Sequence, residues 1–185
     1  METVKAAALL VALACCWPAW NAPAAQEADS LEQRVKATYL YKFAGYVEWP
    51  DVSFATRDTP VTIAVMGDDP LATELDQAVA GRTVNGRRVT VRRLKAGESL
   101  AGVHILFIAR SESSRLPQLV QTAQPRSVLT VTESDGALNY GSVINFLLLD
   151  RHVRFEISLQ SAEKSRLKLS SRLLAVATEV RAGTP

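Results

Sequence analysis

The chain has 185 residues, of which 21 are Lys or Arg and 19 are Asp or Glu, so its formal net charge is only +2. This near balance argues against a general binder of nucleic acid or of another polyanion. Without the export segment described next, about 160 residues remain, which is enough for one domain with a substantial core.

The first residues have the features of a cleaved secretory signal. Lys5 supplies a positive start, residues 6–14 form an apolar run, and residues 22–24 (APA) offer the small-x-small pattern that a signal peptidase requires. The apolar run is shorter than the ~20 residues that span a bilayer. We therefore expect a signal peptide at 1–24 and a mature exported domain at 25–185, with no direct membrane insertion after cleavage.

Both cysteines of the chain, Cys15 and Cys16, lie in this signal. The mature protein would then have no disulfide and no thiol chemistry, although exported proteins enter an oxidising compartment. Lipidation of Cys16 is the alternative to cleavage at 24, but Cys15 would then stand where a lipoprotein signal prefers a small residue.

The mature chain is expected to open with a helix. Residues 25–30 look like a loose leader, in which Asp29 or Ser30 is positioned to cap the helix that follows. Trp49 and Pro50 should end it, because proline disfavours helical geometry in the preceding residue.

One face of this first helix is aromatic. Tyr39, Phe43 and Tyr46 recur at spacings of four and three, which places them on the same side, with Trp49 just beyond. Such a stripe is either a core face packed on a sheet or a surface that binds a partner, and both interpretations remain open.

The middle of the chain alternates between strand and helix patterns. Residues 61–66 and 104–109 are nearly continuous in apolarity, as buried parallel strands are. In chain order we expect a strand at 61–66, a helix at 71–79, strands at 89–92 and 104–109, a helix at 113–122 and a strand at 127–131. This order implies right-handed crossovers on a largely parallel sheet.

The last third of the chain differs. Residues 142–149 and 152–159 form two strand patterns separated by two residues, which predicts an antiparallel hairpin. A final helix is expected at 170–180, with Leu173, Leu174, Ala177 and Val180 facing inward. The predicted fold class is α/β: a single three-layer α/β/α domain, with a mostly parallel sheet and a C-terminal antiparallel hairpin.

Catalytic and metal-binding patterns are weak. The histidines are only His104 and His152, and His104 at the head of an apolar strand is more typical of a hydrogen-bonded core residue than of a ligand. The acidic turn at 67–70 (GDDP) follows a strand, where α/β proteins place chemistry, but a helix cap with proline in the first turn explains it as well. We expect no metal, no cofactor and no enzymatic activity.

Two charged groups could bind a ligand. The first surrounds an Asn-Gly turn and is equally explained as a solvated edge strand; it comprises Arg82, Arg87, Arg88, Arg92 and Arg93. The second lies near the hairpin and could line a groove for a small ligand or a partner, or form ordinary salt-bridging surface; it comprises Arg154, Glu156, Glu163, Lys168 and Arg172.

Several segments together resemble one family. They occur in order along nearly the whole mature chain: 36–43 (KATYLYKF) with 47–50 (VEWP), 63–70 (IAVMGDDP), 84–87 (VNGR), 104–108 (HILFI), 141–146 (GSVINF), 153–157 (VRFEI) and 167–174 (LKLSSRLL). This ordered set resembles the YfiR family of small periplasmic regulators.

The resemblance implies a periplasmic repressor that binds the periplasmic sensor domain of an inner-membrane diguanylate cyclase and lowers cyclic di-GMP synthesis and biofilm formation. It also implies homodimers, and disulfides that tune activity. The chain departs from the last point, since Val103 stands where many relatives have a cysteine. The alternative function is a periplasmic module that senses a small ligand for another membrane signalling or transport protein.

Overall fold

The computed structural model describes residues 22–183. The expected signal peptide lies outside this part of the chain except for residues 22–24, and so do Cys15 and Cys16. The helices are α1 (Ala22–Tyr46), α2 (Asp69–Val79), α3 (Leu116–Ala123), α4 (Leu159–Lys164) and α5 (Ser171–Leu174). The strands are β1 (Val47–Glu48), β2 (Val61–Met66), β3 (Thr83–Val84), β4 (Arg87–Leu94), β5 (Ile105–Ile108), β6 (Leu129–Thr132), β7 (Ile144–Leu149), β8 (His152–Ser158), β9 (Lys168–Leu169) and β10 (Glu179–Arg181).

An eight-stranded sheet organises the domain, in the order β3-β4-β2-β5-β6-β7-β8-β10. The five adjacent strands β4, β2, β5, β6 and β7 are parallel, whereas β8 runs antiparallel to β7 as the predicted hairpin. A second, small sheet joins β1 to β9 in antiparallel fashion at the end of α1. The α/β fold with a mostly parallel sheet and a C-terminal hairpin is therefore confirmed.

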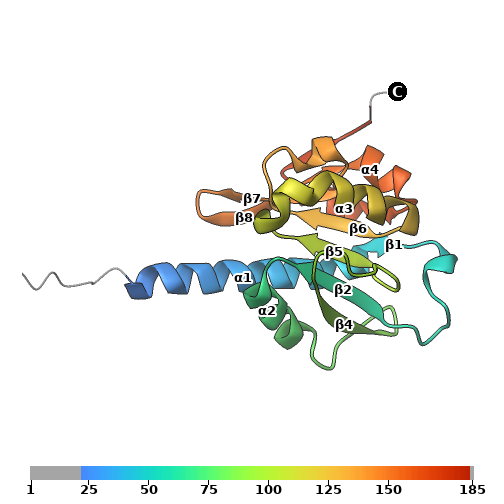
Figure 1. The fold of residues 1–185 in the computed structure, drawn as a ribbon, viewed down its shortest axis with the longest axis horizontal. Coiled ribbons are helices and arrows are strands. Elements are labelled where there is room, and N and C mark those ends of the chain that lie inside the picture. Colours follow the sequence, from blue (N-terminus) through green and yellow to red (C-terminus); the bar gives the residue numbers. More distant parts are fainter. Residues whose placement is uncertain (1–21, 184–185) are drawn as a thin grey trace, which may run out of the picture.

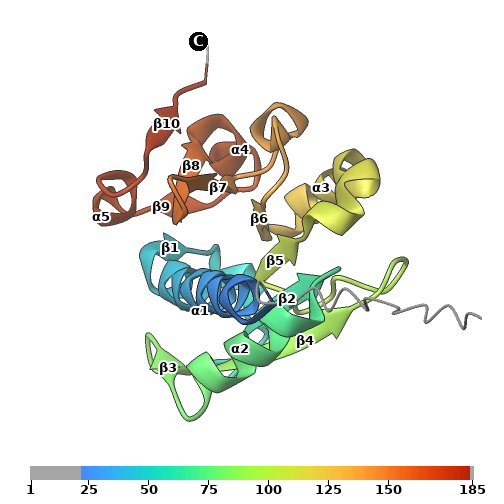
Figure 2. The same cartoon turned by 90° about the vertical axis from the view of Figure 1, so that its left-hand side faces the viewer.

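The sheet is strongly curled. In the view along α1 the strands wrap around this helix, while α3 lies on the opposite, outer face (Figure 2). Seen from the side, the amino-terminal part of α1 and the tip of the β7–β8 hairpin project from the same end of the domain (Figure 1). A long helix and a two-stranded ribbon thus stand beside each other at one end.

The central strands are apolar throughout because both of their faces are covered. In β5, Ile105 and Phe107 point into the core beneath α1 and α2, whereas Leu106 and Ile108 point into the core beneath α3. Side chains alternate between the two faces of a strand, so a strand between two helical layers needs apolar residues at every position. This explains the continuous apolar runs of the sequence.

Two expectations about the helices are wrong. Residues 25–30 belong to α1 instead of a loose leader, so neither Asp29 nor Ser30 is its cap; the Ser30 hydroxyl donates to the Glu27 carbonyl within the helix. The final helix expected at 170–180 is only the four-residue α5, capped by Ser170, and the chain then continues as β10. Val180 is consequently exposed at the surface instead of facing inward.

The region between the hairpin and α5 also contains an element that the sequence pattern did not predict. Residues 159–164 form α4, which is capped by the Ser158 side chain. The predicted helix at 113–122 is shorter than expected, since Arg110–Arg115 form a 3-10 turn and α3 begins at Leu116. Short local patterns of this kind are decided by tertiary packing more than by propensity.

Candidate functional site

The topology of the parallel strands favours a site at their carboxyl edge. The crossover from β2 leads through α2 to β4 on one side, and the crossover from β5 leads through α3 to β6 on the other side. In open α/β sheets ligands bind outside the carboxyl ends of the strands where the order reverses in this way. The residues that follow β2, β5 and β6 therefore define the candidate site.

The acidic turn after β2 acts as a helix cap. Asp68 accepts a hydrogen bond from the Leu71 amide at 2.9 Å, and Pro70 lies in the first turn of α2. Gly67 has a φ of +83°, and a Cβ there would lie 2.3 Å from the Ser111 hydroxyl oxygen. Close packing and a capping carboxylate account for this turn without any chemistry.

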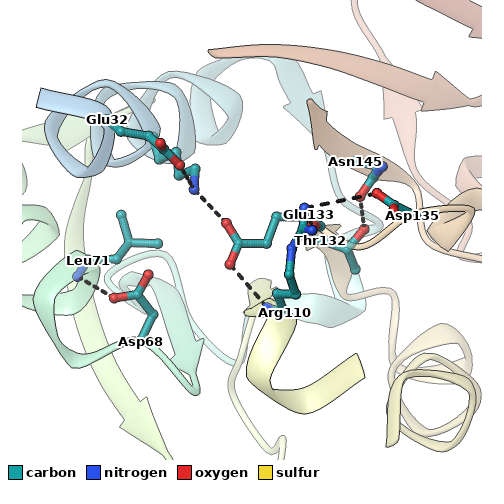
Figure 3. A network of polar contacts seen from close by, with 9 residues as sticks. Glu32, Asp68, Leu71, Arg110, Thr132, Glu133, Asp135 and Asn145 are labelled. Carbon is teal, nitrogen blue, oxygen red and sulfur yellow. Dashed lines mark hydrogen bonds and ion pairs between the residues drawn. The ribbon is translucent and has the colours of Figure 1, made fainter. Parts of the chain in front are cut away.

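The polar contacts that follow β5 and β6 hold α1 to the sheet (Figure 3). The Lys36 ammonium of α1 lies 2.5 Å from a carboxylate oxygen of Glu133 and also pairs with Glu32 one turn earlier. The other oxygen of Glu133 accepts a hydrogen bond from the Arg110 amide at 3.0 Å, and the Arg110 guanidinium donates to the Glu133 carbonyl. Charges from three distant segments therefore neutralise one another at this edge.

Lys36 is only 6% exposed, yet it remains an ammonium. Burial acts to lower its pKa, but the hydrogen bonds that the ammonium donates to Glu133 and Glu32, together with their negative charges, outweigh burial, so the pKa of Lys36 is raised. A buried ammonium between two carboxylates is well suited to hold two elements together and poorly suited to act as a general base.

A cleft of about 480 Å³ opens between α1 and the projecting hairpin beside this ion pair. Its polar wall comes from α1 and from the ends of β5 and β6, and its apolar wall comes from the hairpin. The lining residues are Asp29, Glu32, Gln33, Lys36, Arg110, Glu133, Phe146, Leu147, Leu148 and Val153. Leu148 is 57% exposed, and the side-chain oxygen of Gln33 is buried without a hydrogen-bond partner among residues 22–183.

On the outer face of the sheet a polar row crosses three strands. Thr132, Asn145 and Glu156 are register partners on β6, β7 and β8. Asn145 bridges the other two, at 2.8 Å to Thr132 and 2.9 Å to Glu156. Arg181 of β10 completes the row with an ion pair to Glu156 at 2.9 Å. Glu156 is therefore a buried structural residue.

The other members of the expected ligand groove are spread over the surface. Arg154 lies on β8, Glu163 on α4, Lys168 on β9 and Arg172 on α5, and all four are exposed. Among residues 22–183 none of them forms an ion pair. The structure brings Glu156 together with Asn145 and Arg181 instead of with these four side chains.

The aromatic stripe of α1 lies mainly against the sheet. Phe43 is 1% exposed, and its ring centroid lies 5.2 Å from that of Phe155 and 5.9 Å from that of Phe146. Tyr39 packs on the same rings but is only half-buried, as are Tyr46 and Trp49. The stripe therefore anchors α1, and its half-buried members also reach the surface.

His104 sits in an enclosed aromatic pocket. Its Nδ1 accepts a hydrogen bond from the Thr62 amide at 3.1 Å, so Nε2 carries the proton and donates to the Ser53 carbonyl. Phe54 stacks on the imidazole at 4.4 Å. Burial lowers the pKa of His104, and the nearby positive charge of Arg87 lowers it further, whereas the hydrogen bond to the Ser53 carbonyl acts to raise it.

Arginines of the basic cluster are used within the fold. The Arg87 guanidinium lies 4.0 Å from the Phe54 ring and donates to three backbone carbonyls of the 56–59 loop. Arg93 pairs with Asp76 at 2.8 Å, and Arg92 donates to the Ala101 carbonyl. Arg82 lies over the ring of Tyr41. These contacts match the structural interpretation of the cluster better than an anion site.

The sequence pattern missed Lys36, Arg110, Glu133 and Asn145. Lys36 and Glu133 are 97 positions apart, so no local spacing joins them. The available signal was indirect: Arg110 and Glu133 each follow a predicted strand closely, and ends of neighbouring parallel strands meet at one edge. Within residues 22–183 no group of three or more His, Cys, Asp or Glu side chains is placed to hold a metal ion.

The fold is that of a doubly wound α/β protein, and its candidate sites are the cleft beside Lys36 and the half-buried aromatic side chains of α1. The chain belongs to the YfiR/HmsC-like family, whose model matches residues 33–178. No curated protein sequence is significantly similar to it. In the part of the chain that the structure describes, no helix has the length and apolarity needed to cross a membrane.

A solved structure supports the architecture. The fold is similar to that of a conserved domain protein from Vibrio cholerae O1 biovar El Tor, with a TM-score of 0.51 and 11% sequence identity. The similarity covers 65% of this chain and 54% of that chain, so the present chain spans about half the length of this relative. At this identity the likeness concerns the fold alone.

Proposed function

We propose that the protein is a periplasmic negative regulator that binds the periplasmic sensor domain of an inner-membrane diguanylate cyclase and represses cyclic di-GMP synthesis. The observation that carries this proposal is the family match over residues 33–178. The site geometry is consistent with it, because the polar groups at the carboxyl edge are engaged with one another and no nucleophile with an adjacent base is formed there. The protein then acts by contact, and we expect no enzymatic activity.

The surface of α1 is the proposed contact with the cyclase. Tyr39 and Tyr46 of α1 are half-buried, as is Trp49 just after β1, and amphipathic aromatic side chains at a surface are typical of binding interfaces. Phe43 would support this surface from beneath, since it is buried in the core. A homodimer is also proposed from the family resemblance, and the same face of α1 is available for it.

Comparing two tyrosine variants tests the contact. Tyr46→Ala removes a half-buried ring on α1, and Tyr140→Ala removes a ring of similar chemistry that is 57% exposed in the turn packed near α3. Cells without the protein should have raised cyclic di-GMP, and the wild type and Tyr140→Ala should restore the low level. At equal abundance and melting temperature, Tyr46→Ala should fail to restore it. Unchanged cyclic di-GMP in cells without the protein would refute the repressor function.

Copurification identifies the partner. The tagged protein should retain a membrane diguanylate cyclase from detergent-solubilised inner membranes, and it should appear in the periplasmic fraction without its first 24 residues. Retention of the signal in the cytoplasm would contradict both the predicted export and the proposed partner.

The second candidate function is a periplasmic module that senses a small ligand. The cleft of about 480 Å³ between α1 and the hairpin favours it, because one apolar wall facing several polar groups is the usual composition of a ligand site. The groove predicted around Arg154 and Lys168 stays a separate prediction. Calorimetry with aromatic metabolites distinguishes this function from direct repression, because a pure contact inhibitor should give no heat of binding with them.

A further inference from the structure

A second cavity lies at the opposite, amino edge of the parallel strands. It has a volume of about 320 Å³ and lies where the chain enters β5 and β6. Its polar lining comes from three distant segments: Ser53 after β1, Arg126 and Ser127 before β6, and Arg166 after α4. None of the residues that line it is acidic, so the two guanidinium groups give the cavity a positive charge.

Two hydroxyl groups in this cavity have unused hydrogen-bonding capacity. Ser127 is 2% exposed, and its Oγ has no hydrogen-bond partner among residues 22–183. The Oγ of Ser53 is likewise buried and without a partner in this part of the chain. Both residues line the cavity while their hydroxyl oxygens are buried just beneath its wall. Because buried polar groups are normally hydrogen-bonded, each hydroxyl has unused capacity to offer to a further group.

The two arginines also keep most of their donors. Arg126 donates to the Thr122 carbonyl, and Arg166 donates to the Pro125 carbonyl at 2.7 Å. A guanidinium has five N–H donors, so several remain on each side chain. In residues 22–183 neither arginine forms an ion pair. This differs from Lys36 and Arg93, whose charges are matched by carboxylates.

The backbone holds both segments in conformations that ordinary residues rarely adopt. Ser127 has a φ of 55° and Arg166 has a φ of 58°, in the left-handed region that favours glycine. Both residues also line the cavity. The hydrogen bond from Arg166 to Pro125 ties the two segments together.

We propose that this cavity, at Ser53, Arg126, Ser127 and Arg166, is a binding site for an oxyanion, namely the phosphate or carboxylate group of a small molecule. Arginine forks match the paired oxygens of both groups and bind them through charge-assisted hydrogen bonds. The hydroxyls of Ser53 and Ser127 are buried in the cavity wall, and rotation of either side chain toward the cavity would let it donate to a remaining oxygen and gain the partner it lacks. This site is separate from the α1 surface and from the cleft beside Lys36, and the proposed repressor function does not depend on it.

Thermal denaturation and calorimetry with inorganic phosphate, and in a parallel series with succinate, test the site at constant ionic strength. At least one anion should raise the melting temperature and bind with a dissociation constant below about 20 mM. Binding of phosphate alone identifies a phosphate-bearing ligand, and binding of succinate alone identifies a carboxylate ligand. The absence of binding by both anions overturns the proposal.

Variants show whether such binding occurs here. Arg126→Gln/Arg166→Gln should weaken it by at least about tenfold, whereas Arg57→Gln/Arg88→Gln removes the same charge at exposed positions outside the cavity and should have little effect. Ser127→Ala should weaken binding about three- to tenfold. It should leave the melting temperature of the anion-free protein unchanged or higher, because it deletes a buried hydroxyl without a partner. Equal losses in both double variants would assign the binding to general surface charge and refute the site.

Discussion

Truncation of Phe43 distinguishes the anchoring of α1 from direct contact with a partner. The side chain is 1% exposed and touches the rings of Tyr39, Phe146 and Phe155 at centroid separations of 5.9, 5.9 and 5.2 Å. Phe43→Ala leaves a cavity beneath α1, which for a buried phenylalanine costs about 3–5 kcal/mol of unfolding free energy. The three aromatic contacts place the expected value in the upper half of that range.

The loss is large compared with the total stability of a domain, which is about 5–15 kcal/mol. For a domain of this length each kcal/mol shifts the melting temperature by about 2–4 °C, so we expect a decrease on the order of 10 °C. Urea unfolding followed by far-ultraviolet circular dichroism measures the free energy, and a thermal scan measures the melting temperature. Most molecules should remain folded at 25 °C.

Leu148→Ala is the matched control. Leu148 lies on the same face of the hairpin, one alternate position beyond Phe146, but it is 57% exposed. Its truncation should change stability by no more than about 1 kcal/mol, because most of the side chain already contacts water. If Phe43→Ala were as stable as Leu148→Ala and yet abolished binding of the cyclase, then Phe43 would be a contact residue and the packing argument would be refuted.

Three further perturbations follow from the structure. Lys36→Met should destabilise the fold by about 2–4 kcal/mol in urea unfolding, because Glu133 loses its counter-ion. The double variant Lys36→Met/Glu133→Gln should recover part of this loss. If the single and double variants were equally stable, the ion pair between Lys36 and Glu133 would not be the cause. Gly67→Ala should lower the unfolding free energy by about 1–3 kcal/mol, and with it the melting temperature, because the new Cβ would lie 2.3 Å from the Ser111 hydroxyl at a residue with positive φ. An unchanged melting temperature would contradict this geometry. Because burial depresses the pKa of His104, the folded state resists protonation, so stability should be complete above about pH 6.5 and fall below it by at most about 1.4 kcal/mol per pH unit. His104→Asn should flatten that part of the pH profile, and an equally steep profile in the variant would exclude His104 as its source.

The strands could be predicted from the sequence because burial of a strand produces a local run or alternation of apolar residues. Residues 61–66 were predicted as a strand with the bounds that β2 has, and the hairpin of β7 and β8 was predicted from two apolar segments joined by Asp150 and Arg151. Such patterns depend only on which faces of the sheet are covered.

The C-terminal segment could not be predicted in the same way. Residues 170–180 carry apolar residues at helical spacing, yet the chain leaves the helix after Leu174 because Glu179–Arg181 pair with β8 and Arg181 reaches Glu156. That pairing is a long-range contact, and a three-residue strand has no reliable local signature. The same holds for the triad of Glu32, Lys36 and Glu133, which exists only once α1 lies across the ends of the strands.

The two edges of the sheet differ in how much binding capacity they leave unused. At the carboxyl edge, where the topology favours a ligand, Asp68 caps α2 and Lys36 is neutralised by Glu32 and Glu133, so a charged ligand would have to displace existing ion pairs. At the amino edge, Arg126 and Arg166 lack such partners among residues 22–183, and two hydroxyl groups nearby are unpaired. A buried polar group gains most from a ligand when no protein group has already satisfied it. Recognition of a charged small molecule should therefore occur at the amino edge, whereas the ion pairs of the carboxyl edge hold α1 in place for the proposed contact with another protein.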